Sequence, residues 1–121
     1  MTGGGRWRVR LTASAERDYQ SILRWTSERF GTAQAHVYGE ILTLAIQALT
    51  AGPQVTGSRP RDDIAHGLMT LHVARGGRRG RHLVLYRVGE PSEPPTIDVL
   101  RVLHDSMDPR RHVEDPEDDG S

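Results

Sequence analysis

The chain contains no cysteine, so it has neither a disulfide framework nor cysteine-based nucleophile or zinc chemistry. It contains no lysine either: all sixteen basic residues, apart from histidine, are arginines. The absence of lysine excludes lysine Schiff bases and lysine general bases. Aromatic residues are scarce: one Phe, three Tyr and two Trp. No apolar run approaches the roughly 18 residues that a membrane-spanning helix needs, so we expect no contact with a membrane.

The first ten residues, MTGGGRWRVR, hold no apolar core of the kind found in secretory signals. With cysteine also absent, we expect a cytoplasmic protein. The length of 121 residues suits one domain with a single modest core. We predict a flexible lead at residues 1–6, one domain at residues 7–113 and an acidic, disordered tail at residues 114–121.

A formal net charge of zero conceals an uneven distribution of charge along the chain. Residues 114–121, EDPEDDGS, hold five acids and no base, whereas residues 1–113 hold sixteen arginines against eleven acids. The body is therefore basic and the tail acidic. A basic body suits either a nucleic acid or an acidic protein as a partner, and composition does not choose between them.

Two helices are predicted in the first half of the chain. The alternation of apolar residues with arginine in Trp7–Leu11 indicates a short, half-exposed strand. Thr12 or Ser14 can then cap a helix that ends at Gly31, and Thr32 can cap a second helix that ends in the sequence AGP. So short a connection predicts an antiparallel helical hairpin.

The second half of the chain shows strand patterns. Leu68–Ala74 and His82–Val88 are rich in strand-forming residues, and RGGRRGR between them is typical of a hairpin turn. Thr96–His104 is apolar on both faces, as expected of an interior strand, whereas residues 54–67 show no regular period. We predict an α+β fold of order β-α-α-β-β-β, in which a small, mostly antiparallel sheet carries the helical hairpin on one face.

Seven arginines form a candidate basic surface. Such a cluster can hold phosphates, but no aromatic residues interleave with it for base stacking. The alternative is a solvated turn whose glycines supply positive φ, and we do not expect direct nucleic-acid binding. The seven are Arg59, Arg61, Arg75, Arg78, Arg79, Arg81 and Arg87.

His72 and His82 flank the predicted turn almost symmetrically and could face each other across the hairpin. Two imidazoles can begin a metal site, but a third ligand is needed, and the sequence does not place one. We therefore expect paired surface histidines, with no metal and no other cofactor.

The segment HDSMD after the last strand could carry catalytic groups. His104 could act as a general base oriented by Asp105 or Asp108, and Ser106 could be a nucleophile if the imidazole reached it. Two carboxylates beside the histidine oppose the cationic surroundings that RNA cleavage requires. We favour a polar strand exit, with no catalytic residue.

Three ordered segments resemble the ParE branch of the RelE/ParE toxin superfamily. They are SRPRDDIAHGL, RHLVLYRV and IDVLRVLHDSMDPRRHV, and the FG between the helices extends the resemblance to about residues 7–113. The resemblance implies the same β-α-α-β-β-β fold and a toxin of a type II toxin–antitoxin module. It also implies a hetero-oligomer with a cognate ParD-like antitoxin, whose C-terminal segment wraps and neutralises the toxin.

ParE-like toxins with known action poison DNA gyrase, whereas RelE-like relatives cut mRNA in the ribosome. The absence of lysine and the acids in HDSMD favour gyrase inhibition, so we predict an inhibitor rather than an enzyme. The alternatives are a RelE-type mRNA endonuclease and a toxin-fold binding protein with another target. Position and resemblance together suggest the target-contact residues Arg101, His104, Met107, Asp108, Arg110 and Arg111.

Two features depart from the family pattern. ARGGRRGRH, residues 74–82, is longer and more basic than the usual tight hairpin, and the acidic tail is additional. We expect an exposed, solubilising tail; the alternative is a tail that folds back on the basic body.

Overall fold

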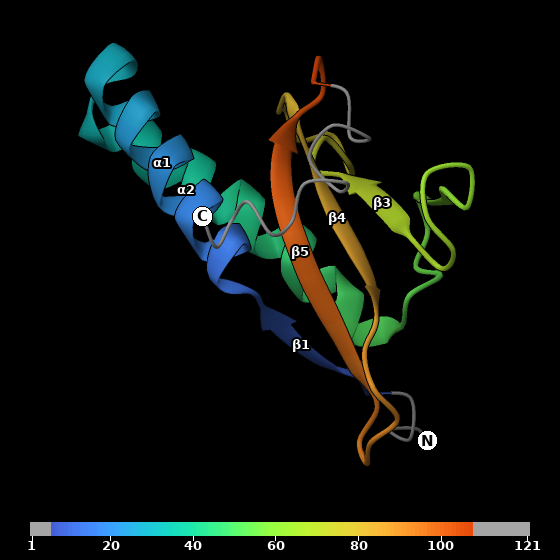
Figure 1. The fold of residues 1–121 in the computed structure, drawn as a ribbon. Helices are drawn as coiled ribbons and strands as arrows, with labels where there is room; N and C mark the ends of the chain where they lie inside the picture. The colour runs from blue at the N-terminus through green and yellow to red at the C-terminus, as the bar shows by residue number, and fades with distance from the viewer. Residues whose placement is uncertain (1–5, 108–121) are drawn as a thin grey trace.

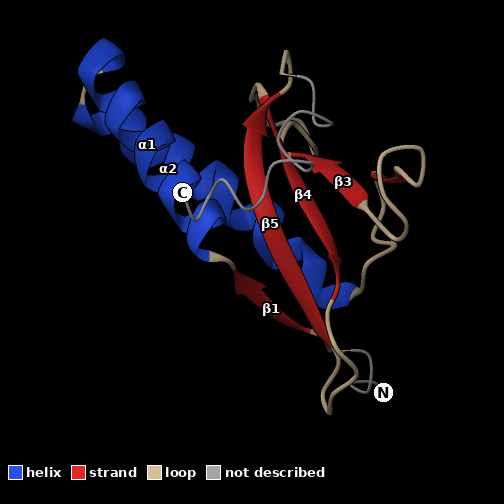
Figure 2. Ribbon diagram, viewed as in Figure 1, coloured by secondary structure: helices blue, strands red, loops and turns tan. Residues whose placement is uncertain are grey.

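The computed structural model describes residues 6–107, in which a helical hairpin packs against one face of a five-stranded sheet (Figures 1 and 2). The predicted α+β class and the order β-α-α-β-β-β are confirmed. The predicted lead up to residue 5, the tail at 114–121, and Asp108, Arg110 and Arg111 lie outside the described residues. Among residues 6–107, no helix is both long enough and apolar enough to cross a membrane.

The two helices are α1 (Ala13–Phe30) and α2 (Thr32–Ala48). Thr12 caps α1, and its side chain accepts a hydrogen bond from the Ala15 amide at 3.2 Å. Gly31 alone separates the helices and has a φ of 97°, which glycine adopts without strain. The chain therefore reverses within one residue, and the predicted antiparallel hairpin is confirmed. A 3₁₀ turn, η2 (Leu49–Ala51), follows α2.

The sheet has the order β1-β5-β4-β3-β2 and only one parallel pair, β1 with β5. β5 lies inside the sheet between β1 and β4, as its two apolar faces predict. A bulge interrupts the β4–β5 ladder at Leu85/Tyr86. The strands are β1 (Arg8–Leu11), β2 (Ser58–Pro60), β3 (Met69–His72), β4 (His82–Val88) and β5 (Thr96–His104).

Strand β2 lies within the connection for which the sequence predicts no regular structure. Its three residues pair antiparallel with β3, from Ser58 opposite Leu71 to Pro60 opposite Met69. Three residues are too few to show an alternating pattern, and Pro60 is tolerated because β2 is an edge strand. Tertiary pairing, rather than local propensity, makes this strand.

The sheet separates a large core from a small one, because successive side chains of a strand point to opposite faces. Val84 and Tyr86 of β4 are fully buried against the helical layer. Leu85, between them, joins Leu68 and Leu103 in a smaller cluster that Ile64 and Ala65 partly cover. The main core joins α1, α2 and the sheet; its buried members include Ala15, Leu42, Ala45, Leu49, Ile97, Val99 and Val102.

Side chains from the start of α1 complete the outer edge of β5, where β1 has already ended. The Thr12 hydroxyl donates to the Leu100 carbonyl at 3.0 Å. Asp18 accepts the Val102 amide at 2.9 Å and also binds Arg101 through both carboxylate oxygens, at 2.7 and 2.9 Å. These bonds satisfy part of an exposed strand edge and join α1 to the sheet.

Candidate functional site

A polar cluster forms where β5 ends, next to the turn between β3 and β4. Its members come from α2, β3, the turn, β4 and the exit of β5, so the fold assembles them from five separate segments. We call it the β5-exit cluster: Tyr38, His72, Arg81, His82, His104, Asp105 and Ser106.

Tyr38 connects the helical layer to this cluster. Its hydroxyl oxygen accepts the Arg81 amide at 3.1 Å and lies 2.7 Å from Nδ1 of His82. Burial, the largest cause, and the electrostatic effect of the neighbouring His104 together lower the pKa of His82 to about 4. His82 is therefore neutral at pH 7, and in the tautomer with its proton on Nε2 it accepts the hydrogen bond of the Tyr38 hydroxyl at Nδ1. Burial also raises the pKa of Tyr38.

Asp105 is the negative centre of the cluster. Its Oδ2 lies 3.1 Å from Nε2 of His72, and its two oxygens accept bonds of 3.4 Å each from the Arg81 guanidinium. The hydrogen bond from His72, followed by that from Arg81, lowers the pKa of Asp105. Asp105 therefore stays ionised and holds β3, the turn and the exit of β5 together.

His104 does reach Ser106, because its Nδ1 lies 2.8 Å from the serine Oγ. The same nitrogen accepts the Ser106 amide at 3.2 Å and lies 3.6 Å from Asp105 Oδ1. In a catalytic triad the acid binds the ring nitrogen opposite the one that faces the serine. Here serine and aspartate share one nitrogen, so the arrangement stabilises a turn and lacks triad geometry.

The six predicted target-contact residues separate into three groups. His104 and Met107 lie at the β5 exit, with Met107 45% exposed, and both can touch a partner. Arg101 instead faces α1, where Asp18 holds it in the ion pair described above. The other three, Asp108, Arg110 and Arg111, lie outside the described residues, so the contact role of all six stays a prediction.

The seven arginines of the predicted basic surface are carried by several segments of the fold, and their role as one surface stays a prediction. Arg75, Arg78, Arg79 and Arg81 share the β3–β4 turn. The others are carried by different segments: Arg59 by the edge strand β2, Arg61 beside Asp63 with bonds of 3.0 and 3.1 Å, and Arg87 near the far end of β4.

The two histidines that flank the turn do not face each other. His72 pairs with Leu83 in the β3–β4 ladder. His82 instead pairs with His104 in the β4–β5 ladder, and the ring centroids of His82 and His104 are 5.3 Å apart. Within residues 6–107, no three side chains of the types that bind metals are grouped to hold an ion.

Sequence reasoning missed Tyr38 and Asp18 as members of functional or structural networks. Tyr38 lies 44 positions before His82, and Asp18 lies 83 before Arg101. Each belongs to a helix, and the helical pattern alone gives neither residue a role. The sequence contains no signal that would have linked these pairs.

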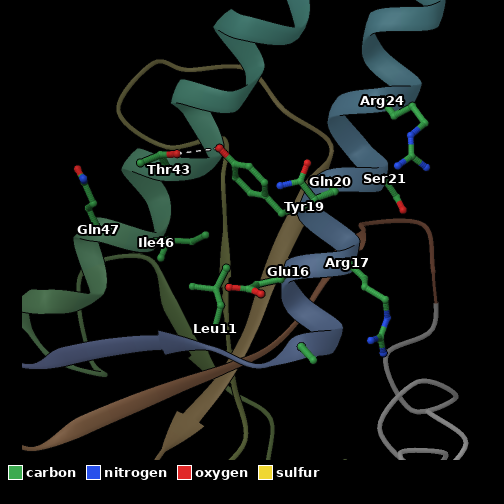
Figure 3. Close-up of a pocket in the computed structure, with 11 residues that line it drawn as sticks. Leu11, Glu16, Arg17, Tyr19, Gln20, Ser21, Arg24, Thr43, Ile46 and Gln47 are labelled. Atoms are coloured by element: carbon green, nitrogen blue, oxygen red, sulfur yellow. Dashed lines mark hydrogen bonds between the residues drawn. The ribbon is translucent and has the colours of Figure 1, made fainter. Parts of the chain in front are cut away.

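A groove between α1 and α2, with a volume of about 840 Å³, is a second candidate surface (Figure 3). Leu11, Ile46 and Tyr19 contribute apolar area, and Arg17 and Arg24 line it from α1. Tyr19 and Thr43, joined by a 3.1 Å hydrogen bond, also line an adjoining hollow of about 540 Å³. The hollows together extend along the hairpin.

Comparison with known proteins agrees with the family suggested by the motifs. Residues 9–109 match the family model described as the ParE toxin of the type II toxin–antitoxin system, parDE. Toxin ParE1 of Mycobacterium tuberculosis is 36% identical over 107 residues, covering 88% of this chain and 97% of that protein. Toxin ParE1 of Caulobacter vibrioides is 30% identical over 104 residues, covering 86% and 95%.

The fold also has a solved counterpart. A chain of the chromosomal ParDE toxin–antitoxin system from P. aeruginosa superposes with a TM-score of 0.66 at 18% identity. The superposition covers 83% of this chain and 97% of that chain. At this identity the likeness shows a shared fold.

Proposed function

This chain belongs to the ParE toxin family of type II toxin–antitoxin systems, and we propose that it acts by binding and inhibiting DNA gyrase, without catalysis of its own. Family membership supports this target, because ParE-like toxins with known action poison that enzyme. The proposed contact surface is the exit of β5, with His104, Met107 and the residues that follow.

One observation carries the proposal that this surface binds rather than cleaves. The potentially reactive groups at the β5 exit are already bonded to one another, with Asp105 held by His72 and Arg81, and His104 by Ser106. Such a network makes a rigid surface, and rigid surfaces lose little entropy on binding. Beside it stands the exposed side chain of Met107, an adaptable apolar group suited to a protein partner.

The test uses purified gyrase with plasmid DNA. We expect the protein to block supercoiling or to increase the amount of cleaved gyrase–DNA complex. Gyrase activity that stays intact in the presence of excess folded protein would count against the proposal. Codon-specific cuts in mRNA on programmed ribosomes would instead support the endonuclease alternative.

A matched pair of variants tests the proposed surface. Met107→Glu places a charge at the β5 exit and is expected to weaken gyrase inhibition about tenfold, as for a central contact worth more than 1 kcal/mol. Val88 is similarly exposed, at 49% against 45% for Met107, but it ends β4 at the far side of the sheet. Val88→Glu should therefore retain full inhibition; equal inhibition by both variants would remove the β5 exit from the proposed contact.

We also infer that a cognate ParD-like antitoxin neutralises the protein, with an acidic, amphipathic segment in the α1–α2 groove. Apolar side chains of such a segment would cover Leu11 and Ile46, while its acids would meet Arg17 and Arg24. Leu44 lines the adjoining hollow and is 41% exposed. Leu44→Asp should raise the antitoxin Kd about tenfold without unfolding the toxin. Unchanged antitoxin affinity would argue against the groove.

A further inference from the structure

The turn between β3 and β4 has a defined backbone path. The Arg78 amide donates to the Arg75 carbonyl at 3.1 Å and closes a β-turn. Its two central residues, Gly76 and Gly77, have φ values of 62° and 82°, a conformation that favours glycine. Arg78 and the next residue, Arg79, are both exposed. The turn therefore presents two adjacent arginines to solvent.

Both ends of this turn are bonded to other parts of the fold. At its start, the Arg75 guanidinium donates from Nη2 to the Thr56 carbonyl at 3.1 Å. At its end, the Arg81 amide donates to the Tyr38 hydroxyl at 3.1 Å, and the Arg81 carbonyl accepts the Asp105 amide at 2.7 Å. A surface held in this way loses little conformational entropy when it binds a ligand.

The turn carries more positive charge than the described carboxylates neutralise. It holds four arginines, and Asp105 is the one carboxylate among residues 6–107 that pairs with any of them, through Arg81 at 3.4 Å. Arg81 nevertheless stays 69% exposed. No acidic side chain in the described part of the chain lies within ion-pair distance of Arg78 or Arg79. Three exposed guanidinium groups can therefore meet an anionic ligand.

The residue types of the turn fit phosphate groups better than an acidic peptide. Besides arginine, residues 74–81 contain only alanine and glycine, so they offer no large apolar side chain to anchor a peptide. Phosphate groups need only cations and backbone amides, and the planar guanidinium binds two phosphate oxygens at once. The glycines also allow a ligand to approach the backbone closely.

The absence of aromatic residues from the turn separates single strands from duplexes. Proteins that bind single strands stack the bases on aromatic side chains, and residues 74–81 contain none. On the sequence alone, this absence led us to expect no direct nucleic-acid binding. It excludes only base stacking, however, because a duplex keeps its own bases stacked and presents its phosphates outward. A duplex is therefore the nucleic acid that this turn fits.

We propose that the β3–β4 turn binds the phosphate backbone of duplex DNA without reading its sequence. The choice of DNA over duplex RNA rests on the proposed function, since gyrase acts on duplex DNA. Met107, the proposed gyrase contact, lies at the same end of the sheet, because β4 begins beside the end of β5 (Figure 1). One end of the sheet can thus contact both the enzyme and the DNA that it holds.

Fluorescence anisotropy of a labelled DNA duplex tests the proposal with the full chain and without gyrase. If three arginines each neutralise one phosphate, the logarithm of the binding constant falls with that of the salt concentration at a slope of about −2.7. Arg78→Gln combined with Arg79→Gln should change this slope to about −0.9 and weaken binding at least about tenfold at about 0.1 M salt.

The matched control is Arg8→Gln combined with Arg87→Gln, which removes two exposed arginines from the other end of the sheet. The seven residues of β4 separate the two ends by about 20 Å, about twice the Debye length at 0.1 M salt. The control should therefore weaken binding less than about threefold. Equal losses in the two double variants, or a wild-type slope near zero, overturn the proposal.

Two competitors test the choice of ligand: a duplex RNA of the same sequence and a polyglutamate peptide of the same charge. The proposal expects both to displace the labelled DNA less effectively than unlabelled duplex DNA does, and the reverse order for either one overturns it. Gyrase inhibition by a protein that does not bind DNA would reject this inference alone. DNA binding through the turn without gyrase inhibition would reject the proposed target alone.

Discussion

At the scale of single residues, the β5-exit cluster depends on how closely the backbone approaches Tyr38. Gly80, just before Arg81, leaves the space that the tyrosine occupies. A Cβ built on Gly80 would collide with Val73 Cγ2 and lie 3.1 Å from the Tyr38 hydroxyl. The absence of one methyl group thus permits the bonds from Tyr38 to His82 and to Arg81.

Gly80→Ala is expected to lower the free energy of unfolding by about 1–3 kcal/mol, as overpacking does in closely packed regions. The displaced Tyr38 would also lose its bond to His82. Urea unfolding measures the first effect, and the chemical shift of the His82 ring measures the second. Ala74→Ser, at an exposed position of the same segment, should change neither.

The second prediction at this scale concerns pH. The folded-state pKa of His82, about 4, lies below its ordinary value of 6.5. Between these two pH values His82 binds a proton in the unfolded chain but not in the folded protein. The free energy of unfolding therefore falls as the pH drops from 6.5 towards 4. The slope corresponds to at most about one proton.

Urea unfolding at pH 7.0, 5.5 and 4.5, or pH values near these, measures this slope. His82→Gln should flatten it, because the amide accepts the Tyr38 hydroxyl without titrating. His66 is fully exposed, with its nearest carboxylate oxygen, on Asp62, 3.9 Å away, and His66→Gln should leave the slope unchanged. If His82→Gln shows the same pH dependence of the free energy of unfolding as the wild type, the proton is bound by another group.

At the scale of secondary-structure elements, the outer part of β5 is stabilised by a helix instead of a strand. Asp18 of α1 replaces a neighbouring strand by accepting the Val102 amide, and it neutralises Arg101 at the same time. Strand β1 could not do this, because its pairing with β5 ends at Leu11 opposite Val99. One carboxylate therefore joins the helical layer to the sheet and protects an edge from strand addition.

Asp18→Ala should lower the free energy of unfolding by about 1–3 kcal/mol, since it removes the acceptor of a part-buried backbone amide together with one ion-pair partner of Arg101. The matched control is Asp98→Ala. Asp98 binds Arg10 at 3.1 Å, but that arginine is 64% exposed whereas Arg101 is 25% exposed. The control should cost less than about 1 kcal/mol, and an equal cost for both variants would contradict the account of the β5 edge.

At the scale of the whole molecule, the two cores of the sheet and the hairpin account for the stability of residues 6–107. The buried aliphatic residues belong to the helical layer, the strands and the segment at 64–68. These elements are complete before residue 108, where the described part of the chain ends. The predicted domain at 7–113 is consistent with this distribution but stays a prediction.

A chain that ends after Val113 is therefore expected to keep the stability of the full-length protein within about 1 kcal/mol at 0.15 M salt, because both cores lie within residues 6–107. Urea unfolding of the two proteins in parallel provides the measurement. A loss of several kcal/mol would place residues 114–121 inside the folded domain and contradict the predicted boundary.

The sequence by itself determined the order of the elements and the family. Apolar periodicity, Thr12, Gly31 and the strand patterns are local signals, and local hydrogen bonding and burial produce the elements that they predict. The short strand β2 had no such signal, because three residues show no period. It forms only when β3 is present to pair with it.

Only the tertiary structure decided which side chains meet. The register of β3, β4 and β5 places His82 opposite His104, although the sequence suggested His72 as its partner. Packing of α2 on the sheet then brings Tyr38 to His82 across 44 positions. Such contacts depend on register and on the distance between layers, and neither is encoded in the neighbouring residues. For the same physical reason, the sequence left open whether His104 reaches Ser106, and the fold places His104 Nδ1 2.8 Å from the serine Oγ.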